Sequence, residues 1–326
     1  SKAEIAVAHL TSSGKDVSPE QVRESARAGD LRSLKLLGIA GVNFNEPDAL
    51  NRSAVHLAIQ NDQWAALKLL EKFGGNILQK DRRGQTPLSM LIKKGRIDIA
   101  ERYIAQGASI QFRDPDNTPA LMTYLREEDF KAFEFLLKNK ANPNDLDSHG
   151  RSPLQLAFEL GLPDRVAQLI SAGASAKRLR LDSSPAIAAL SSDSARYNIT
   201  SDQLPSIVFG LIEAGADPDE VDPRSQLRPI ILAVRNGEKT MLEVLLANQV
   251  DTADCLWQAI LHDREDVLEL LLSIGESADV PGENGDTPLV SLVRSGKNLK
   301  LIEKLLDYGA DPDQLTIEGQ GLLFMA

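Results

Sequence analysis

Apolar residues between positions 86 and 107 recur at the three- and four-residue spacing of amphipathic helices, in two short runs divided by a polar turn. Thr86 can cap the first run, and Pro87 suits the first helical position because its missing N–H is not needed there. Gly107 ends the second run, since a residue at this place often takes a positive φ. The segment predicts two short helices with apolar stripes formed by Leu88, Leu91, Ile92, Ile97, Ile99, Ala100, Tyr103 and Ile104.

The same two-helix unit recurs along the chain. Positions equivalent to Thr86 follow one another at steps of 33, 32, 34, 32, 44, 26 and 33 residues. A unit of this kind cannot bury its own apolar stripes and needs copies of itself on both sides. The equivalent positions are Ser53, Thr86, Thr118, Ser152, Ser184, Arg228, Asp254 and Thr287.

A period near 33 residues that carries a Thr-Pro-Leu phrase resembles the ankyrin-repeat family, from roughly residue 18 to the end. The resemblance implies an all-α fold, an ankyrin-repeat solenoid of about nine repeats plus a C-terminal half-repeat. It further suggests a stand-alone array similar to bacterial members of the family. In the second helices, Leu137 and Leu271 are expected to be buried.

The ends and two repeats depart from the pattern. Residues 1–17 are expected to form a helix and linker that seal the N-terminal end, and residues 18–326 to form the array. The fifth Thr-Pro-Leu repeat carries an insertion at residues 191–203, and the segment 247–254 in the sixth is too short for the usual connecting loop. Residues 319–326 would begin the half-repeat.

Composition and net charge limit the ligands and the compartment that we expect for the protein. The 326 residues carry a formal net charge of −11, which argues against binding nucleic acid over the whole surface. No apolar run approaches the roughly 20 residues of a membrane span, and no signal peptide is visible. The single cysteine, Cys255, is expected to be a buried apolar residue. We therefore expect a soluble protein, monomeric alone, in the cytoplasm or in a bacterial periplasm after removal of a leader.

The residues with reactive side chains form no recognisable site. The four histidines, His9, His56, His149 and His262, fall in different repeats and lack zinc-ligand spacing. His56 occupies the histidine of the Thr-Pro-Leu-His phrase, which in the ankyrin family braces neighbouring turns. No phosphate-binding glycine loop or nucleophile elbow is present. We predict no catalytic residues, no cofactor, no metal and no enzymatic activity.

The resemblance implies that a partner docks on the concave face formed by the connecting loops and first helices. Among the sixteen positions at the exposed ends of the first helices, five are basic and one is acidic. This bias predicts a positively charged groove, although basic residues at helix ends also complement the helix dipole on their own. Residues 191–203 are either a tolerated insertion or a contact loop. The predicted partner-binding residues are Arg82, Arg83, Gln85, Lys93, Lys94, Arg126, His149, Arg151, Arg196, Tyr197, Arg224, Arg235 and Arg294.

These observations favour a non-enzymatic module that binds another protein with an acidic surface. Within this class we favour sequestration or inhibition of one specific enzyme, by analogy with bacterial ankyrin proteins that protect their host. The alternative is a passive assembly scaffold. A nucleic-acid binder and an enzyme embedded in the array are the remaining, weaker readings.

Overall fold

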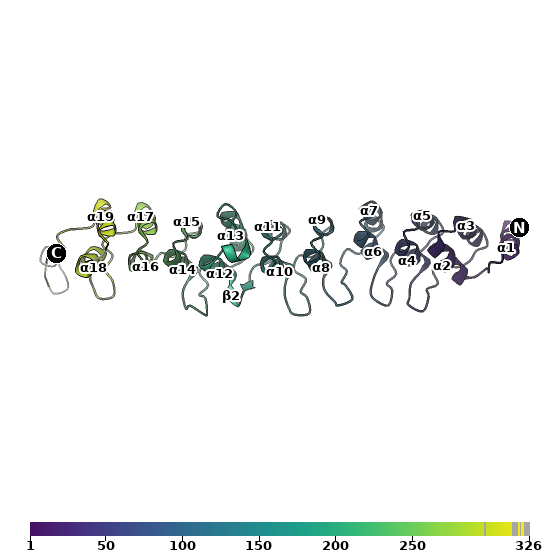
Figure 1. The fold of residues 1–326 in the computed structure, drawn as a ribbon, viewed down its shortest axis with the longest axis horizontal. Coiled ribbons are helices and arrows are strands. Elements are labelled where there is room, and N and C mark those ends of the chain that lie inside the picture. The colour runs from purple at the N-terminus through teal and green to yellow at the C-terminus, as the bar shows by residue number, and fades with distance from the viewer. Residues whose placement is uncertain (297, 315–318, 320, 323–326) are drawn as a thin grey trace. The chain divides into compact units, whose positions relative to one another are not determined.

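The computed structural model describes residues 1–296, 298–314, 319 and 321–322. Within these residues the chain forms short helices with one two-residue hairpin, which confirms the all-α ankyrin-type solenoid (Figure 1). The chain divides into two compact units, residues 1–156 and 157–326. Of the predicted C-terminal half-repeat, residues 320 and 323–326 lie outside the described residues.

Unit 1 contains nine helices and the start of a tenth. They are α1 (Lys2–Ser12), α2 (Pro19–Ala28), α3 (Leu31–Ile39), α4 (Ala54–Gln60), α5 (Trp64–Lys72), α6 (Pro87–Lys93), α7 (Ile97–Ala105), α8 (Ala120–Arg126), α9 (Phe130–Lys138) and α10 (Pro153–Glu159), which crosses the boundary between the units.

Unit 2 continues the alternation of short helices. Its elements are α11 (Pro163–Ser171), β1 (Arg180–Leu181), β2 (Ser184–Pro185), α12 (Ala186–Ser192), the 3₁₀ turn η1 (Ala195–Tyr197), α13 (Leu204–Glu213), α14 (Pro229–Asn236), α15 (Lys239–Ala247), α16 (Cys255–Leu261), α17 (Glu265–Ser273), α18 (Pro288–Ser295) and α19 (Leu299–Asp307). The antiparallel hairpin pairs Leu181 with Ser184, and its turn residues Asp182 and Ser183 have positive φ.

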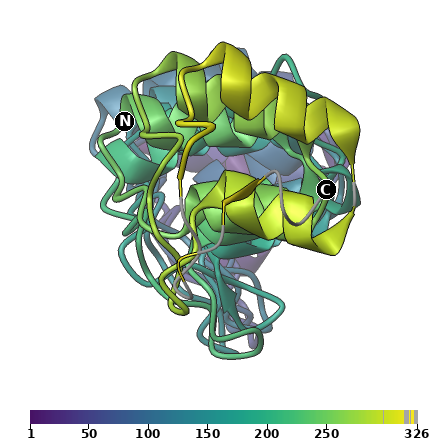
Figure 2. The same ribbon diagram turned by 90° about the vertical axis from the view of Figure 1, so that its left-hand side faces the viewer.

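Each unit stacks its helices in two layers. In unit 1, α2, α4 and α6 pack in succession, α3 packs against α5, and each first helix packs against the second helix that follows it. In unit 2, α12, α14 and α16 form one layer, and α11, α13 and α15 the other. The loops that lead from a second helix to the next first helix project on the first-helix side, and we call them fingers (Figures 1 and 2). Helix α1 lies against α3.

Local sequence explains where the first helices begin. The Thr86 hydroxyl accepts a hydrogen bond from the Ser89 amide (N···O 3.1 Å), and Pro87 fills the first helical position, as the sequence predicts. The same arrangement opens α2, where the Ser18 hydroxyl accepts from the Gln21 amide at 3.2 Å. Gly107, with φ of +94°, follows the end of α7 as expected.

The paired leucines of the second helices contribute unequally to the core. Leu271 is buried as predicted, but Leu137 is only half-buried, and its neighbour Leu136 is the fully buried residue. The prediction for Leu137 is wrong because consecutive residues of a helix point about 100° apart, and the buried face of α9 includes Phe133 and Leu136 but not Leu137. The rotation of each second helix about its axis therefore decides which of the paired leucines joins the core.

Candidate protein-binding face

Four aspartates at strict intervals of 33 residues shape the fingers of unit 1: Asp48, Asp81, Asp114 and Asp147. Each carboxylate accepts backbone N–H groups from the residues two and four positions further on, at N···O distances of 2.8–2.9 Å. These hydrogen bonds fix the backbone turn at each finger tip, and with it the positions from which the side chains project. The sequence contains this signal as an aspartate repeated every 33 residues, but the prediction of binding residues did not use it.

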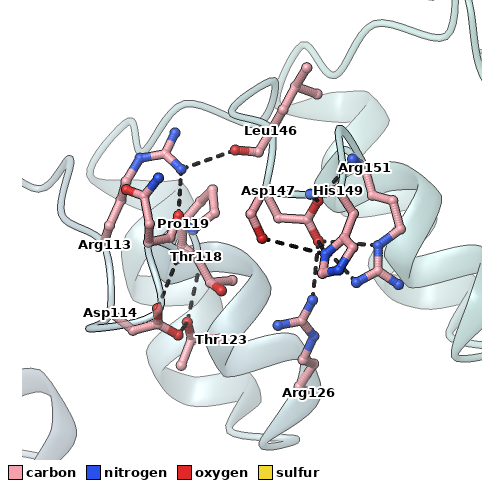
Figure 3. Close-up of polar contacts among 12 residues, drawn as sticks. Arg113, Asp114, Thr118, Pro119, Thr123, Arg126, Leu146, Asp147, His149 and Arg151 are labelled. Atoms are coloured by element: carbon pink, nitrogen blue, oxygen red, sulfur yellow. Dashed lines mark hydrogen bonds and ion pairs between the residues drawn. The ribbon is translucent and has the colours of Figure 1, made fainter.

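Asp147 holds the largest of these networks (Figure 3). Its side chain is 1% exposed, and its Oδ2 accepts from Arg151 Nε (3.1 Å), Arg151 Nη2 (2.9 Å) and Arg126 Nη2 (3.2 Å). His149 Nδ1 lies 3.8 Å from the same oxygen. Burial alone would raise the pKa of Asp147, but the hydrogen bonds from Arg151 and His149 outweigh it and hold the pKa below its usual value. Arg126 and Arg151 therefore have a charge partner inside the array.

Asp114 links its finger to the following first helix, because Thr123 Oγ1 in α8 donates to its Oδ2 at 3.0 Å. Beside it, Arg113 Nη1 donates to the carbonyl of Asn117 in its own finger and to the carbonyl of Leu146 in the next one, at 2.8 and 3.0 Å (Figure 3). One guanidinium thus ties two successive fingers together. The two fingers present a connected surface rather than two independent loops.

His56 is fully buried and braces the finger that carries Gln85. Its Nδ1 lies 2.9 Å from Ser53 Oγ and 3.2 Å from the Ser53 amide, and its Nε2 lies 3.4 Å from the carbonyl oxygen of Gln85. The Ser53 amide can only donate to Nδ1, so the ring is the neutral tautomer that donates from Nε2. This geometry agrees with the bracing role that the Thr-Pro-Leu-His phrase implies.

We expect His56 to make stability depend on pH. Burial holds the pKa of His56 below its ordinary value of 6.5, although Asp81 and Asp48 partly counter this. The unfolded chain therefore takes up a proton before the folded chain does. Full stability is present above about pH 6.5 and is lost as the pH falls through the lower folded pKa, at up to about 1.4 kcal/mol per pH unit. Urea midpoints measured between neutral pH and about pH 5 test this.

His9, exposed on α1, provides the matched control. The His56→Gln variant should lose the acid-dependent part of the unfolding midpoint shift, whereas His9→Gln should keep it. Equal pH profiles for His56→Gln and the parent would show that another group causes the loss.

The predicted arginines and lysines of unit 1 fall into two groups. Arg82, Arg83 and Lys93 are exposed and form no ion pair with any residue that the structure describes. Lys94, by contrast, donates to Asp62 Oδ1 at 2.8 Å, and Arg126 and Arg151 are bound to Asp147. Lys94, Arg126 and Arg151 thus serve the array itself, and we call Arg82, Arg83 and Lys93 the basic triad.

The basic triad borders two clefts between successive repeats of unit 1. The first, of about 190 Å³, is lined by Arg82, Arg83 and His56 among others. The second, of about 200 Å³, is lined by Lys93, Tyr124 and Phe112 among others. Gln85, another predicted binding residue, lines both clefts, so they form adjoining parts of one surface. We call this surface the triad groove.

Most of the predicted binding residues of unit 2 already contact other residues of the array. Arg294 is bound to Asp286, and Arg235 Nε lies 2.9 Å from His262 Nε2. Arg196 pairs with Asp182 at 3.1 Å. Arg224 is exposed and makes no ion pair with a described residue.

Tyr197 corrects the interpretation of the insertion. It is 7% exposed and therefore cannot serve as an exposed anchor for a partner. Its ring packs edge-on against Phe158, with ring centroids 6.0 Å apart, and its hydroxyl donates to Asp182 Oδ2 at 2.9 Å. The neighbouring Ile199 is buried as well. Because an aromatic and an aliphatic side chain face inward, the segment packs onto the rest of unit 2. Of its two predicted binding residues, only Arg196 remains exposed.

Charge is distributed unevenly between the units. Residues 1–156 contain 22 basic and 20 acidic residues, a formal charge of +2. Residues 157–326 contain 14 basic and 27 acidic residues, a formal charge of −13. The acidity of the whole chain therefore belongs to unit 2, and the triad groove lies in the unit without an acidic excess.

Repeated helix pairs, finger turns built on aspartates and histidine bracing define a repeat protein of the ankyrin class. A family model described as ankyrin repeats (three copies) matches residues 23–114, 89–179 and 197–316. The chain belongs to the ankyrin-repeat family, whose repeats are protein–protein interaction modules.

Relatives share parts of the array. Human Ankyrin repeat and SOCS box protein 11 is 34% identical over 105 residues, which are 30% of this chain and 32% of that protein. An Intracellular phospholipase A2 of Caenorhabditis elegans is 30% identical over 139 residues, 40% of this chain and 13% of that protein. An Ankyrin repeat and KH domain-containing protein of Caenorhabditis briggsae is 26% identical over 240 residues, 71% of this chain and 9% of that protein.

This chain spans about a third or less of the length of each of these relatives. All three are animal proteins, so they give no support to a bacterial type of array. Among the described residues, no group of three or more His, Cys, Asp or Glu side chains is arranged to hold a metal ion. No helix in the described part of the chain has the length and apolar character needed to cross a membrane.

Proposed function

We propose that the chain binds another protein through the triad groove of unit 1, and that the bound surface is acidic. The observation that carries this proposal is the basic triad itself. Arg82, Arg83 and Lys93 are the predicted binding residues of this unit whose charges no carboxylate of the described array neutralises. Their charges remain available for carboxylates of a partner.

The surroundings of the triad support binding rather than simple solvation. The backbone of Arg83 donates to Asp81, and that of Arg82 donates to the Leu50 carbonyl of the preceding finger at 2.9 Å. The two arginines therefore start from a fixed backbone, which reduces the conformational entropy lost on binding. Arginine binds carboxylates through two parallel hydrogen bonds. The cleft beside Lys93 offers apolar contact at the partly exposed Phe112.

Within this function we favour sequestration or inhibition of one specific enzyme, with a passive assembly scaffold as the alternative. Neither requires a catalytic group in the array. Nucleic acid is the weaker choice of ligand, because the chain carries a net charge of −11 and basic proteins dominate that kind of binding.

We expect reversal of the triad, Arg82→Glu with Arg83→Glu and Lys93→Glu, to weaken partner binding by about ten-fold or more. Folding should change little, because exposed charges contribute about 0–1 kcal/mol each. Parent and variant are immobilised, exposed to nuclease-treated lysate, and compared by quantitative mass spectrometry of the retained proteins. At least one protein should be depleted by the reversal, and its retention should fall as salt rises.

The matched control reverses three exposed lysines of the second helices, Lys68, Lys72 and Lys131, none of which forms an ion pair with a described residue. Both triple variants change the net charge by the same amount, so a general charge effect would appear in both. Equal retention by the triad variant and the control would contradict the proposal. Adding the parent chain to the depleted partner, if that partner is an enzyme, then separates inhibition from scaffolding.

A further inference from the structure

One finger of unit 2 is missing. Helix α15 ends at Ala247 and α16 begins at Cys255, so only residues 248–254 connect them, whereas residues 274–287 connect α17 to α18. The long finger between α17 and α18 therefore has no finger of similar length beside it, because the connection between α15 and α16 is short. The consequence is a cleft of about 790 Å³ on the finger side of unit 2, beside the start of α16. We call it the notch.

The notch exposes an aromatic ring. Trp257 is the third residue of α16, the position that His56 occupies in α4, and it is partly exposed in the notch. Its Nε1 donates to the carbonyl of Val280 in the following finger at 3.1 Å, as His56 does to Gln85. The tryptophan thus keeps the bracing contact, while its ring offers more area than an imidazole for a ligand to cover.

The charged residues that line the notch around the Trp257 ring are all acidic. Asp254, Glu276 and Glu283 line the notch, and none of the described residues that line it is basic. Glu276 accepts from Thr252 Oγ1, but Asp254 and Glu283 are exposed and have no hydrogen-bond or ion-pair partner among the described side chains. The nearby Arg228 is already bound to Asp251 Oδ2 (3.1 Å) and to the carbonyl of Ala253.

We infer that the notch receives a basic loop of a partner protein, with an arginine or lysine side chain over the Trp257 ring and between Asp254 and Glu283. An aromatic face attracts a cation, and two unpaired carboxylates beside it add attraction of the same sign. The −13 charge of unit 2 guides such a loop toward the surface. This surface is separate from the triad groove, and it takes the opposite charge.

Fluorescence of Trp257 tests the inference. The second tryptophan, Trp64, is replaced by Phe so that Trp257 is the only reporter. The probe is a capped peptide of sequence Gly-Arg-Gly-Arg-Gly, compared with the Gln and Glu versions. The Arg peptide should change the emission saturably and with an affinity that falls as salt rises, and the Gln and Glu peptides should not. Equal response to the Gln peptide would overturn recognition of a cation.

Two variants separate the notch from general acidity. Asp254→Asn with Glu283→Gln should weaken the Arg peptide by about ten-fold. Glu303→Gln with Asp307→Asn removes the same charge from exposed positions of α19 and should have little effect. Trp257→His, followed by calorimetry, keeps a donor for Val280 while removing the indole ring, and it should also lose binding. Retained binding in Trp257→His, or equal loss in both charge variants, would refute the inference.

Discussion

Replacing Asp147 by Ala should destabilise the array by about 1–3 kcal/mol, the cost of leaving partly buried hydrogen-bonding groups without their partner. The side chain is 1% exposed, and its loss leaves the amides of His149 and Arg151 without their acceptor. It also removes the carboxylate that the guanidinium groups of Arg126 and Arg151 contact. Urea unfolding of the full chain, followed by circular dichroism, measures the change.

Asp116 supplies the control for this prediction. It lies in the preceding finger, is exposed, and its carboxylate makes no hydrogen bond or ion pair with a described residue. Asp116→Ala should therefore change the free energy of unfolding by only about 0.5 kcal/mol or less. If both alanine variants unfold at the same urea concentration, the Asp147 network contributes no stability and the fingers are held by other contacts.

The helices could be predicted because their signals are local. Thr86 and Pro87 specify a helix start through bonds within four residues, and Gly107 specifies an end through its own backbone geometry. The repeat period then supplied the stacking, since each unit contacts only its neighbours. Which leucine of a pair faces the core was harder, as Leu136 and Leu137 show. Rotating the helix about its axis by one residue position would exchange the two leucines, and contacts with the neighbouring repeats fix that rotation.

The candidate site was less predictable because charge pairing is not local. Lys94 finds Asp62 32 residues away, and Arg126 finds Asp147 21 residues away. Counting basic residues at the ends of the first helices therefore overestimated the free positive charge of the face. The buried Tyr197 was missed for the same reason, because its partner Phe158 lies in another repeat. The useful signal is the aspartate repeat at 33-residue intervals, because it marks the finger turns from the amino-acid sequence alone.

These ion pairs also change the explanation for the excess of basic residues at the ends of the first helices. Lys93, Arg126 and Arg294 all lie in the last turn of a first helix, where a cation complements the helix dipole. Of these three, Arg126 and Arg294 also bind a finger aspartate, whereas Lys93 does not. Selection for folding can account for the paired residues. Lys93, Arg82 and Arg83 are therefore the residues on which a binding experiment is most informative.

Truncating Leu271 to Ala should lower the free energy of unfolding by about 2–5 kcal/mol. The side chain is fully buried in α17, which packs against α16 and α19, so its removal leaves a cavity that helices held on two sides cannot readily close. In a linear array the loss weakens the interfaces with both neighbouring repeats, and the unfolding midpoint of unit 2 should fall. Urea unfolding of the full chain provides the measurement.

Leu270, the preceding residue in the same helix, provides the matched control for Leu271→Ala. It is only partly buried, so Leu270→Ala changes the same chemistry and the same helix propensity but removes fewer buried contacts. We expect its cost to be roughly half that of Leu271→Ala or less. Equal costs would mean that helix propensity rather than core packing determines the effect. A cost below about 1 kcal/mol for Leu271→Ala would mean that the repeats around α17 close the cavity by shifting along the stack.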